Sequence, residues 1–442
     1  MYRLYNILFT LLLGLSAPYY LWKLWRRGNW KTDFGQRFGS YSTRVKQAVT
    51  NRQILWLHAV SVGEVNLCTQ LIRSLELRVP NMTLAVSTTT STGMGELLRK
   101  LPSHILKVYY PIDRRRWVQR AFGIFHPTAV VLVEAEIWPN FLWRARQQRV
   151  PVFLVNARLS PRSYRGYKRF GWLFRPLFEA MAGVGCQNEE DARKLIELGC
   201  KPEVVRVVGN MKYDAAQLDE RRATDVPRLL GQLGVPPDAR LLVAGSTHRG
   251  EEGILGEIFL RLRTRIPNLF LVVVPRHHER GKQAGRDLAA KGVKFAYRTH
   301  VTPATQYQPG QVDCLLVNTT GELKCFYECA SVVFVGKSLT AEGGQNPIEP
   351  ALMAKPIVFG PNMQNFEAIT RALVSRQGAL QVADAAELEK ALASLLTDEK
   401  LAAETARNGR LVVQENLGSI ERTVEMILET MDPKEVYIVP GK

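Results

Sequence analysis

Two acidic positions follow apolar, strand-like runs of this sequence and could carry acid–base chemistry. The first is Glu64, which ends the segment HAVSVGE at 58–64, where Gly63 permits a tight turn into a helix. A carboxylate at the start of that helix, facing a ligand cleft, would be placed to act as a general base. The same position suits a glutamate that only caps the helix. The residue types leave both interpretations open.

The second acidic position is a pair, Glu134 and Glu136, directly after the apolar run 129–133. Two carboxylates can hold a divalent cation, as the D-x-D pair of many sugar-nucleotide enzymes does. No D-x-D sequence occurs in this chain. Charge stabilisation or positioning of an acceptor is therefore the favoured role for the pair.

A basic stretch without any Asp or Glu runs from Ile137 to Phe178. It is either a solvated basic face or a surface that meets anionic lipid or a phosphorylated acceptor. Aromatic residues between cations also suit single-stranded nucleic acid, but the apolar N-terminus favours lipid. The cations are Arg144, Arg146, Arg149, Arg158, Arg162, Arg165, Lys168, Arg169 and Arg175.

Four segments in or near the second half have the residue types that bind phosphates. GNMKYD at 209–214 puts Lys212 after a strand, and GSTHRGEE at 245–252 is a small-residue loop that opens a helix. Such a loop offers unpaired N–H groups to an anion. PRHH at 275–278 ends a strand with a cation, and EGGQNPIEP at 342–350 is a glycine turn into a helix. Together they predict a nucleotide-binding half, in which Glu349 would grip ribose hydroxyls.

These segments are separated by alternating strand-like and helix-like runs, which is typical of doubly wound parallel sheets. A polar, proline-containing stretch at 219–238 divides the alternation and is interpreted as an interdomain linker. The expected domains are 1–31, 32–215 and 216–442. The expected strands are 54–60, 83–87, 105–110, 129–133, 152–155, 183–187, 204–208, 241–244, 269–274, 312–317, 331–335 and 357–359.

The first of these domains is an apolar segment, because residues 4–22 carry no charge and four cations follow by position 31. About 20 apolar residues can span a bilayer once. The trailing cations would hold the body of the chain in the cytosol. A cleaved signal peptide would have its cations first. A helix lying in the membrane interface is a further alternative, since Asn6, Gly14 and Pro18 weaken a spanning helix. The last alternative is a buried helix.

Composition supports a globular protein with an anionic partner. The chain has 442 residues, enough for two or three domains, and a formal net charge of +18. Such a surface favours nucleic acid, anionic lipid or phosphorylated substrates. The 6 cysteines are scattered without zinc-site spacing, as in a reducing compartment.

The motifs together resemble those of the 3-deoxy-D-manno-octulosonic acid (Kdo) transferase family, which attaches Kdo to the lipid A precursor of Gram-negative bacteria. The resemblance covers nearly the whole chain. It rests on the N-terminal apolar segment and on SVGE at 61–64, E-x-E-x-WPN at 134–140, NARLS at 156–160, QNEED at 187–191, STH-x-GEE at 246–252, PRH at 275–277, GEL at 321–323 and EGG-x-NP-x-E at 342–349.

The resemblance implies a GT-B glycosyltransferase with two Rossmann-like domains facing a cleft. It also implies inverting, metal-independent transfer of Kdo from CMP-Kdo to lipid IVA, with no cofactor. By this resemblance Glu64 is the general base, and Glu134 and Lys212 stabilise the transition state. The enzyme would sit at the inner membrane, with its domains on the cytoplasmic side and the anionic membrane surface as a partner. The residues matching CMP-binding positions are Pro275, Arg276, Thr320, Gly321, Glu322, Asn346, Pro347, Ile348 and Glu349.

Three positions depart from the family pattern: Asn318, usually acidic, Lys337, often glycine, and Gln345, often histidine. They bear on donor contacts rather than on the reaction. A GT-B enzyme that uses a UDP-sugar is the alternative function, and CMP against UDP binding separates the two. A nucleic-acid-binding protein without catalysis is disfavoured, because no recognised nucleic-acid module occurs in the sequence.

Overall fold

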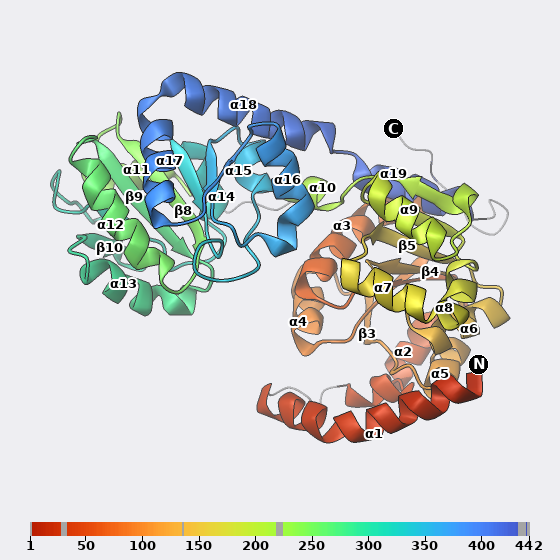
Figure 1. The fold of residues 1–442 in the computed structure, drawn as a ribbon. Helices are drawn as coiled ribbons and strands as arrows, with labels where there is room; N and C mark the ends of the chain where they lie inside the picture. Colours follow the sequence, from red (N-terminus) through yellow and green to blue (C-terminus); the bar gives the residue numbers. More distant parts are fainter. Residues whose placement is uncertain (1, 28–32, 135–136, 218–223, 432–438, 440–442) are drawn as a thin grey trace. The chain divides into compact units, whose positions relative to one another are not determined.

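The computed structural model describes residues 2–27, 33–134, 137–217, 224–431 and 439. The chain divides into two compact units: unit 1 comprises Met1–Ala215 and Leu417–Lys442, and unit 2 comprises Ala216–Asn416. Each unit is built on a seven-stranded sheet covered by helices (Figure 1). The predicted fold class, two Rossmann-like α/β domains of the GT-B type, is confirmed.

The sheet of unit 1 has the strand order β3-β2-β1-β4-β5-β6-β7, and all neighbours pair in parallel. The order reverses at β1, which lies between β2 and β4. Ligands of such sheets bind beyond the carboxyl ends of the strands where the order reverses. The strands are β1 (Ile54–His58), β2 (Thr83–Thr88), β3 (Leu106–Tyr109), β4 (Pro127–Val133), β5 (Val152–Ala157), β6 (Gly183–Cys186) and β7 (Val205–Val207).

Helices bury both faces of this sheet, so β1 is apolar along its length rather than alternating. Ile54 and Trp56 pack into one core, and Leu55 and Leu57 into the other. The helices are η1 (Phe34–Phe38), α2 (Thr43–Val49), α3 (Val62–Arg78), α4 (Ser91–Lys100), α5 (Arg115–Phe125), α6 (Pro139–Gln147), α7 (Pro161–Arg169), α8 (Gly171–Phe178), α9 (Glu189–Glu197), η2 (Pro202–Val204), α10 (Lys212–Gln217) and α19 (Ser419–Leu428).

Helix α19 comes from the far end of the chain but belongs to unit 1 (Figure 1). The carboxylate of Asp214 accepts hydrogen bonds from the backbone N–H groups of Gly418 (2.6 Å) and Ile420 (2.9 Å), which fixes the start of the helix. Val424 and Ile427 complete the core that includes α3. The expected third domain, 216–442, therefore runs too far, because its last segment carries apolar residues that unit 1 buries.

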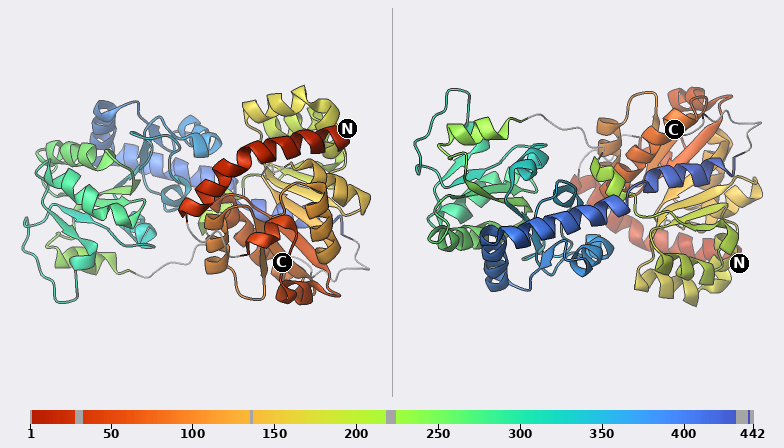
Figure 2. Two further views of the ribbon diagram at one scale, coloured as in Figure 1. Left: turned by 90° about the horizontal axis from the view of Figure 1, so that it is seen from below. Right: turned by 90° about the horizontal axis from the view of Figure 1, so that it is seen from above.

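The N-terminal helix α1 (Tyr2–Arg27) lies along the outside of unit 1 (Figure 2). Its Tyr5 hydroxyl donates a hydrogen bond of 2.7 Å to the buried carboxylate of Asp113. The same carboxylate accepts from the backbone N–H groups of Asn140 and Phe141. Burial raises the pKa of Asp113 to about 6, although these hydrogen bonds oppose the shift. One carboxylate thus holds α1 against the start of α6.

The two faces of α1 differ. Tyr5, Asn6 and Phe9 are half-buried towards unit 1, while the leucines and Ile7 of the opposite face are exposed. Within the described ranges, no helix is both long and apolar enough to cross a bilayer. The expected anchor segment, 1–31, therefore contains a helix docked on unit 1 through residues such as Tyr5. Its residues 1 and 28–31 lie outside the described part.

The sheet of unit 2 has the order β10-β11-β9-β8-β12-β13-β14, again all parallel. The order reverses at β8, between β9 and β12. Phe259, Leu271 and Phe334 lie in the core on one of its faces. The strands are β8 (Arg240–Thr247), β9 (Leu269–Pro275), β10 (Phe295–Tyr297), β11 (Cys314–Leu316), β12 (Val332–Val335), β13 (Ile357–Phe359) and β14 (Leu380–Gln381).

Two expectations for unit 2 need correction. The edge strands β10 and β14 were not predicted. The expected linker 219–238 contains helix α11, whose Val226, Leu229 and Leu230 are buried, while residues 218–223 lie outside the described part. The helices are α11 (Val226–Gln232), α12 (Glu251–Arg263), η3 (His278–Arg280), α13 (Gly281–Ala289), η4 (Arg298–His300), α14 (Leu323–Cys329), α15 (Ile348–Leu352), η5 (Gln364–Phe366), α16 (Glu367–Ser375), α17 (Ala385–Thr397) and α18 (Glu399–Glu415).

Candidate active site

Two predicted catalytic carboxylates flank the point where the strand order of unit 1 reverses. Glu64 lies in the first turn of α3, after β1, and Glu134 directly follows β4. Because β1 and β4 are parallel neighbours, the two residues share one edge of the sheet. Glu134 has a φ of 61°, a left-handed conformation that costs a non-glycine residue on the order of 1 kcal/mol. Glu136 lies outside the described residues.

Glu64 is part of the cap of α3. The Ser61 hydroxyl accepts a hydrogen bond from the Glu64 N–H, and Glu64 Oε2 accepts one of 2.8 Å from the Val60 N–H. These bonds fix the carboxylate at the helix start, where the partial positive charge of the helix stabilises its ionised form. The side chain remains half-exposed. The capping role and the predicted role as a base are therefore compatible.

Lys212, the third predicted catalytic residue, lies among these carboxylates. Burial lowers the pKa of its ammonium group, and the nearby Arg158 lowers it further. The negative charges of Glu134 and Glu64 act in the opposite direction. The structure therefore gathers Glu64, Glu134, Lys212 and Arg158 into one cluster. Arg158, which directly follows β5, was seen in the sequence only as one cation of the basic stretch.

Two asparagines position Lys212. The buried Asn156 accepts a hydrogen bond of 3.1 Å from the Met211 N–H. Asn210 accepts one of 3.0 Å from the Lys212 N–H and donates one of 3.0 Å to Gln187. Asn156 has a φ of 52°. Sequence reasoning missed both residues, although they belong to the motifs at 156–160 and 209–214.

The predicted donor-binding segments of unit 2 gather at one edge of its sheet. The segments follow β9, β11 and β12. Strands β9 and β12 are the neighbours of β8, and β11 is the next strand beyond β9. The Arg276 N–H donates to the Thr247 carbonyl, 3.0 Å away, which joins the ends of β9 and β8. The Arg276 side chain is exposed and forms no ion pair with any described residue.

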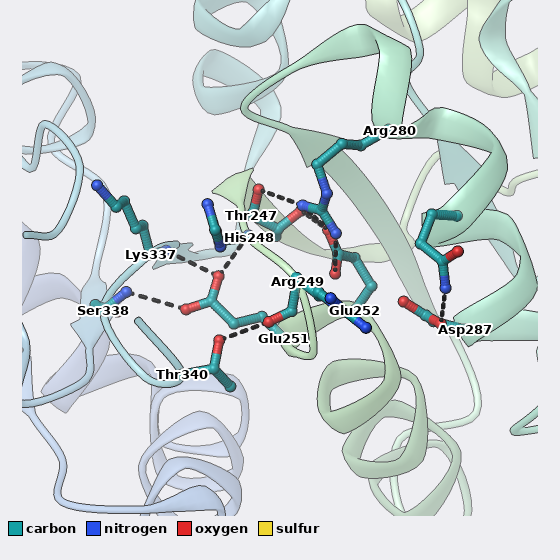
Figure 3. Close-up of polar contacts among 11 residues, drawn as sticks. Thr247, His248, Arg249, Glu251, Glu252, Arg280, Asp287, Lys337, Ser338 and Thr340 are labelled. Atoms are coloured by element: carbon teal, nitrogen blue, oxygen red, sulfur yellow. Dashed lines mark hydrogen bonds and ion pairs between the residues drawn. The ribbon is translucent and has the colours of Figure 1, made fainter. Parts of the chain in front are cut away.

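Glu251 joins the two strands at which the order of unit 2 reverses. Its side chain is fully buried, and each carboxylate oxygen accepts two backbone hydrogen bonds, of which Figure 3 draws those from His248, Lys337 and Ser338. Oε2 accepts from His248 (2.7 Å) and Lys337 (2.8 Å). Oε1 accepts from Ser338 and Leu339, both at 3.0 Å. Glu251 thereby fixes the loop after β12 against the loop after β8.

The adjacent Glu252 points the other way, towards Arg280 (Figure 3). Its carboxylate, which is also fully buried, accepts hydrogen bonds from Arg280 at 3.0 and 3.3 Å and from the Thr247 hydroxyl at 3.0 Å. This two-pronged ion pair connects α12 to the segment after β9. Neither Glu251 nor Glu252 was among the predicted site residues.

The glycine turn after β12 adopts conformations that side chains disfavour. Gly343 and Gly344 have φ values of 114° and 69°. Asn346 Oδ1 accepts from the Ile348 N–H at 3.1 Å, and its amide donates to Glu349 Oε1 at 3.2 Å. These contacts hold the predicted ribose ligand Glu349 in the first turn of α15. Pro347 is the N-cap residue of that helix.

The third predicted donor segment, with Thr320 and Gly321, is held from within. Its Glu322 is buried and accepts hydrogen bonds from Thr224 (2.8 Å) and Arg298 (3.2 Å). This internal pairing stabilises the turn, and a direct contact of Glu322 with a nucleotide stays a prediction.

The three departures from the family pattern have different structural settings. Lys337 has a φ of 54°, which is a conformation that glycine adopts without strain. Asn318 both accepts from the Thr299 N–H and donates to the Thr299 hydroxyl. Gln345 is half-buried. Over the described ranges, no three His, Cys, Asp or Glu side chains are grouped so that they could hold a metal ion.

Comparisons with known proteins agree with these motifs. Residues 32–215 match the family described as 3-deoxy-D-manno-octulosonic-acid transferase (kdotransferase). The 3-deoxy-D-manno-octulosonic acid transferase of Bordetella pertussis is 31% identical, over 94% of this chain and 96% of its own. The enzyme of the same name from Haemophilus influenzae is 30% identical, over 94% of this chain and 93% of its own.

Among solved structures, the UDP-GlcNAc 2-epimerase of Neisseria meningitidis has the same fold. It is 13% identical and superposes with a TM-score of 0.57, over 85% of this chain and all of the epimerase chain. This likeness extends over both units and concerns the fold alone. The similarity to the two transferases, in contrast, is a similarity of sequence over nearly the whole length of the chains. It shows that the chain belongs to the 3-deoxy-D-manno-octulosonic acid transferase family.

Proposed function

We propose that this protein is an inverting, metal-independent glycosyltransferase that moves Kdo from CMP-Kdo to the lipid A precursor lipid IVA. The observation that carries the proposal is the gathering of Glu64, Glu134 and Lys212 where the strand order of unit 1 reverses. These are the residues to which the family resemblance assigns catalysis. Relatives named as Kdo transferases match 94% of this chain, which supports the same reaction.

In the proposed reaction Glu64 is the general base. It takes the proton of an acceptor hydroxyl while that oxygen attacks the anomeric carbon of Kdo. The new carbon–oxygen bond forms on the face opposite CMP, and the bond to the CMP phosphate breaks with its electron pair leaving on the phosphate. Attack from the opposite face inverts the configuration. The carboxylate is held ready by the Val60 N–H, and such a base contributes about 10²–10⁴-fold to the rate.

Lys212 and Arg158 supply positive charge to the same edge of the sheet. Negative charge grows on the CMP phosphate as its bond breaks, and fixed cations stabilise it most where water is largely excluded. Glu134 favours the protonated form of Lys212, because its carboxylate opposes the lowering of the lysine pKa by burial. We assign Glu134 this electrostatic role and no metal.

Unit 2 is assigned the donor nucleotide. Arg276 presents an exposed guanidinium directly after β9. Glu251 holds the loop after β8 and the loop after β12 together through its hydrogen bonds. Glu349 projects from the first turn of α15. A cation, a fixed loop edge and a carboxylate are the groups that a CMP phosphate and ribose require.

The membrane supplies the acceptor, and we assign α1 to its interface rather than to a spanning segment. Support comes from the exposed apolar face of the helix, which reaches 83% exposure at Leu15. The opposite face is tied to unit 1 through Tyr5. A helix with one docked and one apolar face lies flat on a bilayer. We propose on the same grounds, and from the family resemblance, that the protein lies at the inner membrane with both units on the cytoplasmic side.

A transfer assay tests the proposal. Detergent-solubilised protein is incubated with tetraacylated lipid IVA and with CMP-Kdo generated in the reaction, and products are weighed by mass spectrometry. We expect a gain of one or more Kdo units, unchanged by EDTA. No gain despite CMP binding would contradict the acceptor, whereas no gain with UDP binding instead of CMP would contradict the donor.

A further inference from the structure

A half-enclosed cavity of about 250 Å³ opens beside the first turn of α1 in unit 1. Since water occupies about 30 Å³ per molecule in the liquid, the cavity has room for a phosphate and its ester groups. Helices α1, α5 and α6, which lie side by side (Figure 1), form its walls. Its lining includes Tyr2, Arg3, Arg115, Asn140, Trp143 and Arg144.

Positive charge in this cavity is not neutralised by any side chain that the structure describes. Helices α1, α5 and α6 contain no Asp or Glu. Across the described residues, Arg3, Arg115 and Arg144 make no ion pair, and the inaccessible Nε of Arg144 has no hydrogen-bond partner. The neighbouring Asp113 is occupied by Tyr5 and two backbone N–H groups. Unpaired guanidinium groups around a cavity favour an anion, best a phosphate.

Side-chain contacts join the walls of the cavity. Tyr2 packs on Trp143 with ring centroids 4.0 Å apart, and the Asn6 and Asn140 side chains exchange hydrogen bonds of 3.1 Å. Trp143 is only 3% exposed, so its ring offers no face on which a nucleotide base could stack. The group that the cavity's cations suit is the phosphate of a ligand.

An apolar strip begins directly beside the cations. Leu4, Ile7 and Leu8, in the first two turns of α1, are each at least half exposed. A ligand that places a phosphate next to Arg3 would lay its attached chains on this strip. An inorganic anion uses the cations alone, whereas a phospholipid uses both features. Because the three helices offer no carboxylate for a choline or ethanolamine amine, a lipid with net negative charge fits better.

We propose that this cavity binds the phosphodiester headgroup of an anionic glycerophospholipid of the membrane. The bound lipid fastens the start of α1 to the bilayer and fixes the orientation of unit 1 on it. The proposal rests on the interfacial position assigned to α1 under the proposed function, but not on the reaction catalysed. It identifies the lipid class that the interface must contain.

The test compares two double variants of the full chain by vesicle flotation. Arg115→Gln/Arg144→Gln removes two cavity cations, and Arg116→Gln/Arg146→Gln removes one neighbouring cation from each of the same helices outside the cavity lining. Vesicles are pure phosphatidylcholine or contain phosphatidylglycerol. We expect the cavity variant to lose about tenfold more affinity for the anionic vesicles than the control does, and neither variant to change on neutral vesicles.

Salt separates the headgroup site from general attraction to a charged surface. Raising NaCl shortens the screening length to about 3 Å at 1 M, which abolishes long-range attraction but spares a paired, half-buried phosphate. The difference between the two variants should therefore persist in high salt. Equal losses of affinity in both variants would overturn the proposal. It would also be overturned if inorganic phosphate released the protein from vesicles more than chloride does at equal ionic strength, because the site would then bind free phosphate.

The transfer assay distinguishes this site from the acceptor site. With lipid IVA in detergent micelles, Arg115→Gln/Arg144→Gln should transfer Kdo as the wild type does, and it should be impaired only with acceptor in anionic vesicles. Equal impairment in micelles would assign the cavity to the acceptor and overturn the proposal. Calorimetric unfolding checks that unit 1 of the variant is folded, and the Arg115→Lys/Arg144→Lys variant, which keeps both charges, should retain part of the vesicle preference.

Discussion

Glu64 of unit 1 and Glu251 of unit 2 occupy equivalent positions with opposite surroundings. Each lies in the first turn of the helix that follows the first strand of its sheet, where the strand order reverses. Glu64 is half-exposed, accepts the Val60 N–H and lies near Lys212. Glu251 is fully buried and accepts four backbone N–H groups.

The difference teaches that position in a Rossmann-like unit does not decide what a carboxylate does. Hydrogen bonds from four backbone N–H groups occupy both carboxylate oxygens of Glu251. This side chain is therefore a structural junction between two loops. A base must instead keep a lone pair accessible to a substrate proton. The surroundings of Glu64 are thus compatible with the proposed proton transfer, whereas those of Glu251 fit it only for holding two loops together.

The largest expected effect is on catalysis in unit 1. Glu64→Gln keeps an amide oxygen for the Val60 N–H but removes the base, so kcat should fall about 10³-fold. The thermal midpoint and CMP affinity should stay near the wild-type values, because the cap survives. Steady-state kinetics and calorimetry check this. A folded Glu64→Gln enzyme with full activity would exclude Glu64 as the base.

The next effect concerns stability in unit 2. Glu251→Gln turns an NH₂ group towards two backbone N–H donors, leaving them buried without acceptors. At about 1–3 kcal/mol for each, unfolding free energy should fall by about 3 kcal/mol, and KM for the donor should rise. Denaturant titration measures the first quantity. Glu257→Gln, on an exposed face of the same helix, is the matched control and should unfold almost as the wild type does. An equal loss of unfolding free energy in both variants would refute the role of Glu251 as a junction between the loops.

Lys212 should shape the alkaline side of the pH profile. Because burial lowers its pKa, the ammonium loses its proton at a lower pH than an ordinary lysine does. Activity should therefore fall as pH rises through this lowered pKa. Lys212→Arg, whose guanidinium stays charged past pH 12, should keep some activity without that limb. Profiles of kcat/KM for both proteins test this, and superimposable alkaline limbs would exclude Lys212 as the titrating group.

The smallest effect concerns Lys337, which donates its N–H to Glu251 from a left-handed conformation. Lys337→Gly and Lys337→Ala both remove the side chain, but only glycine adopts this φ without strain. The glycine variant should be more stable than the alanine variant by about 1 kcal/mol. Thermal unfolding of the pair measures the difference, and a more stable alanine variant would contradict the backbone geometry.

Both units could be predicted as far as local patterns reach. The twelve expected strands were largely apolar runs, and all of them exist. Most are buried on both faces, as parallel strands are, although β7 at the edge of its sheet is largely exposed. Strand β14 was missed because it has only two residues, and β10 because Lys294 and Arg298 flank its three residues, so that no longer apolar run marks it. The packing of α19 on unit 1 was missed because the hydrogen bond that caps the helix joins Asp214 to Ile420, which are 206 residues apart in the sequence.

For the site, the sequence and the family resemblance supplied Glu64, Glu134 and Lys212, and the structure brings these together. Asn156 and Glu251 were missed for a shared reason: each acts on backbone N–H groups of a distant segment, and local patterns do not show such partners. A left-handed φ at Asn156 or Lys337 is equally invisible in the sequence.

The most direct test of the division between the units measures CMP affinity and single-turnover transfer for Glu64→Gln and Glu251→Gln side by side. We predict that Glu64→Gln binds CMP as the wild type does and fails in transfer. We predict that Glu251→Gln binds CMP more weakly but, once saturated with donor, transfers at a rate within a few-fold of the wild type. Weaker CMP binding in Glu64→Gln, with normal transfer at saturation, would contradict the account.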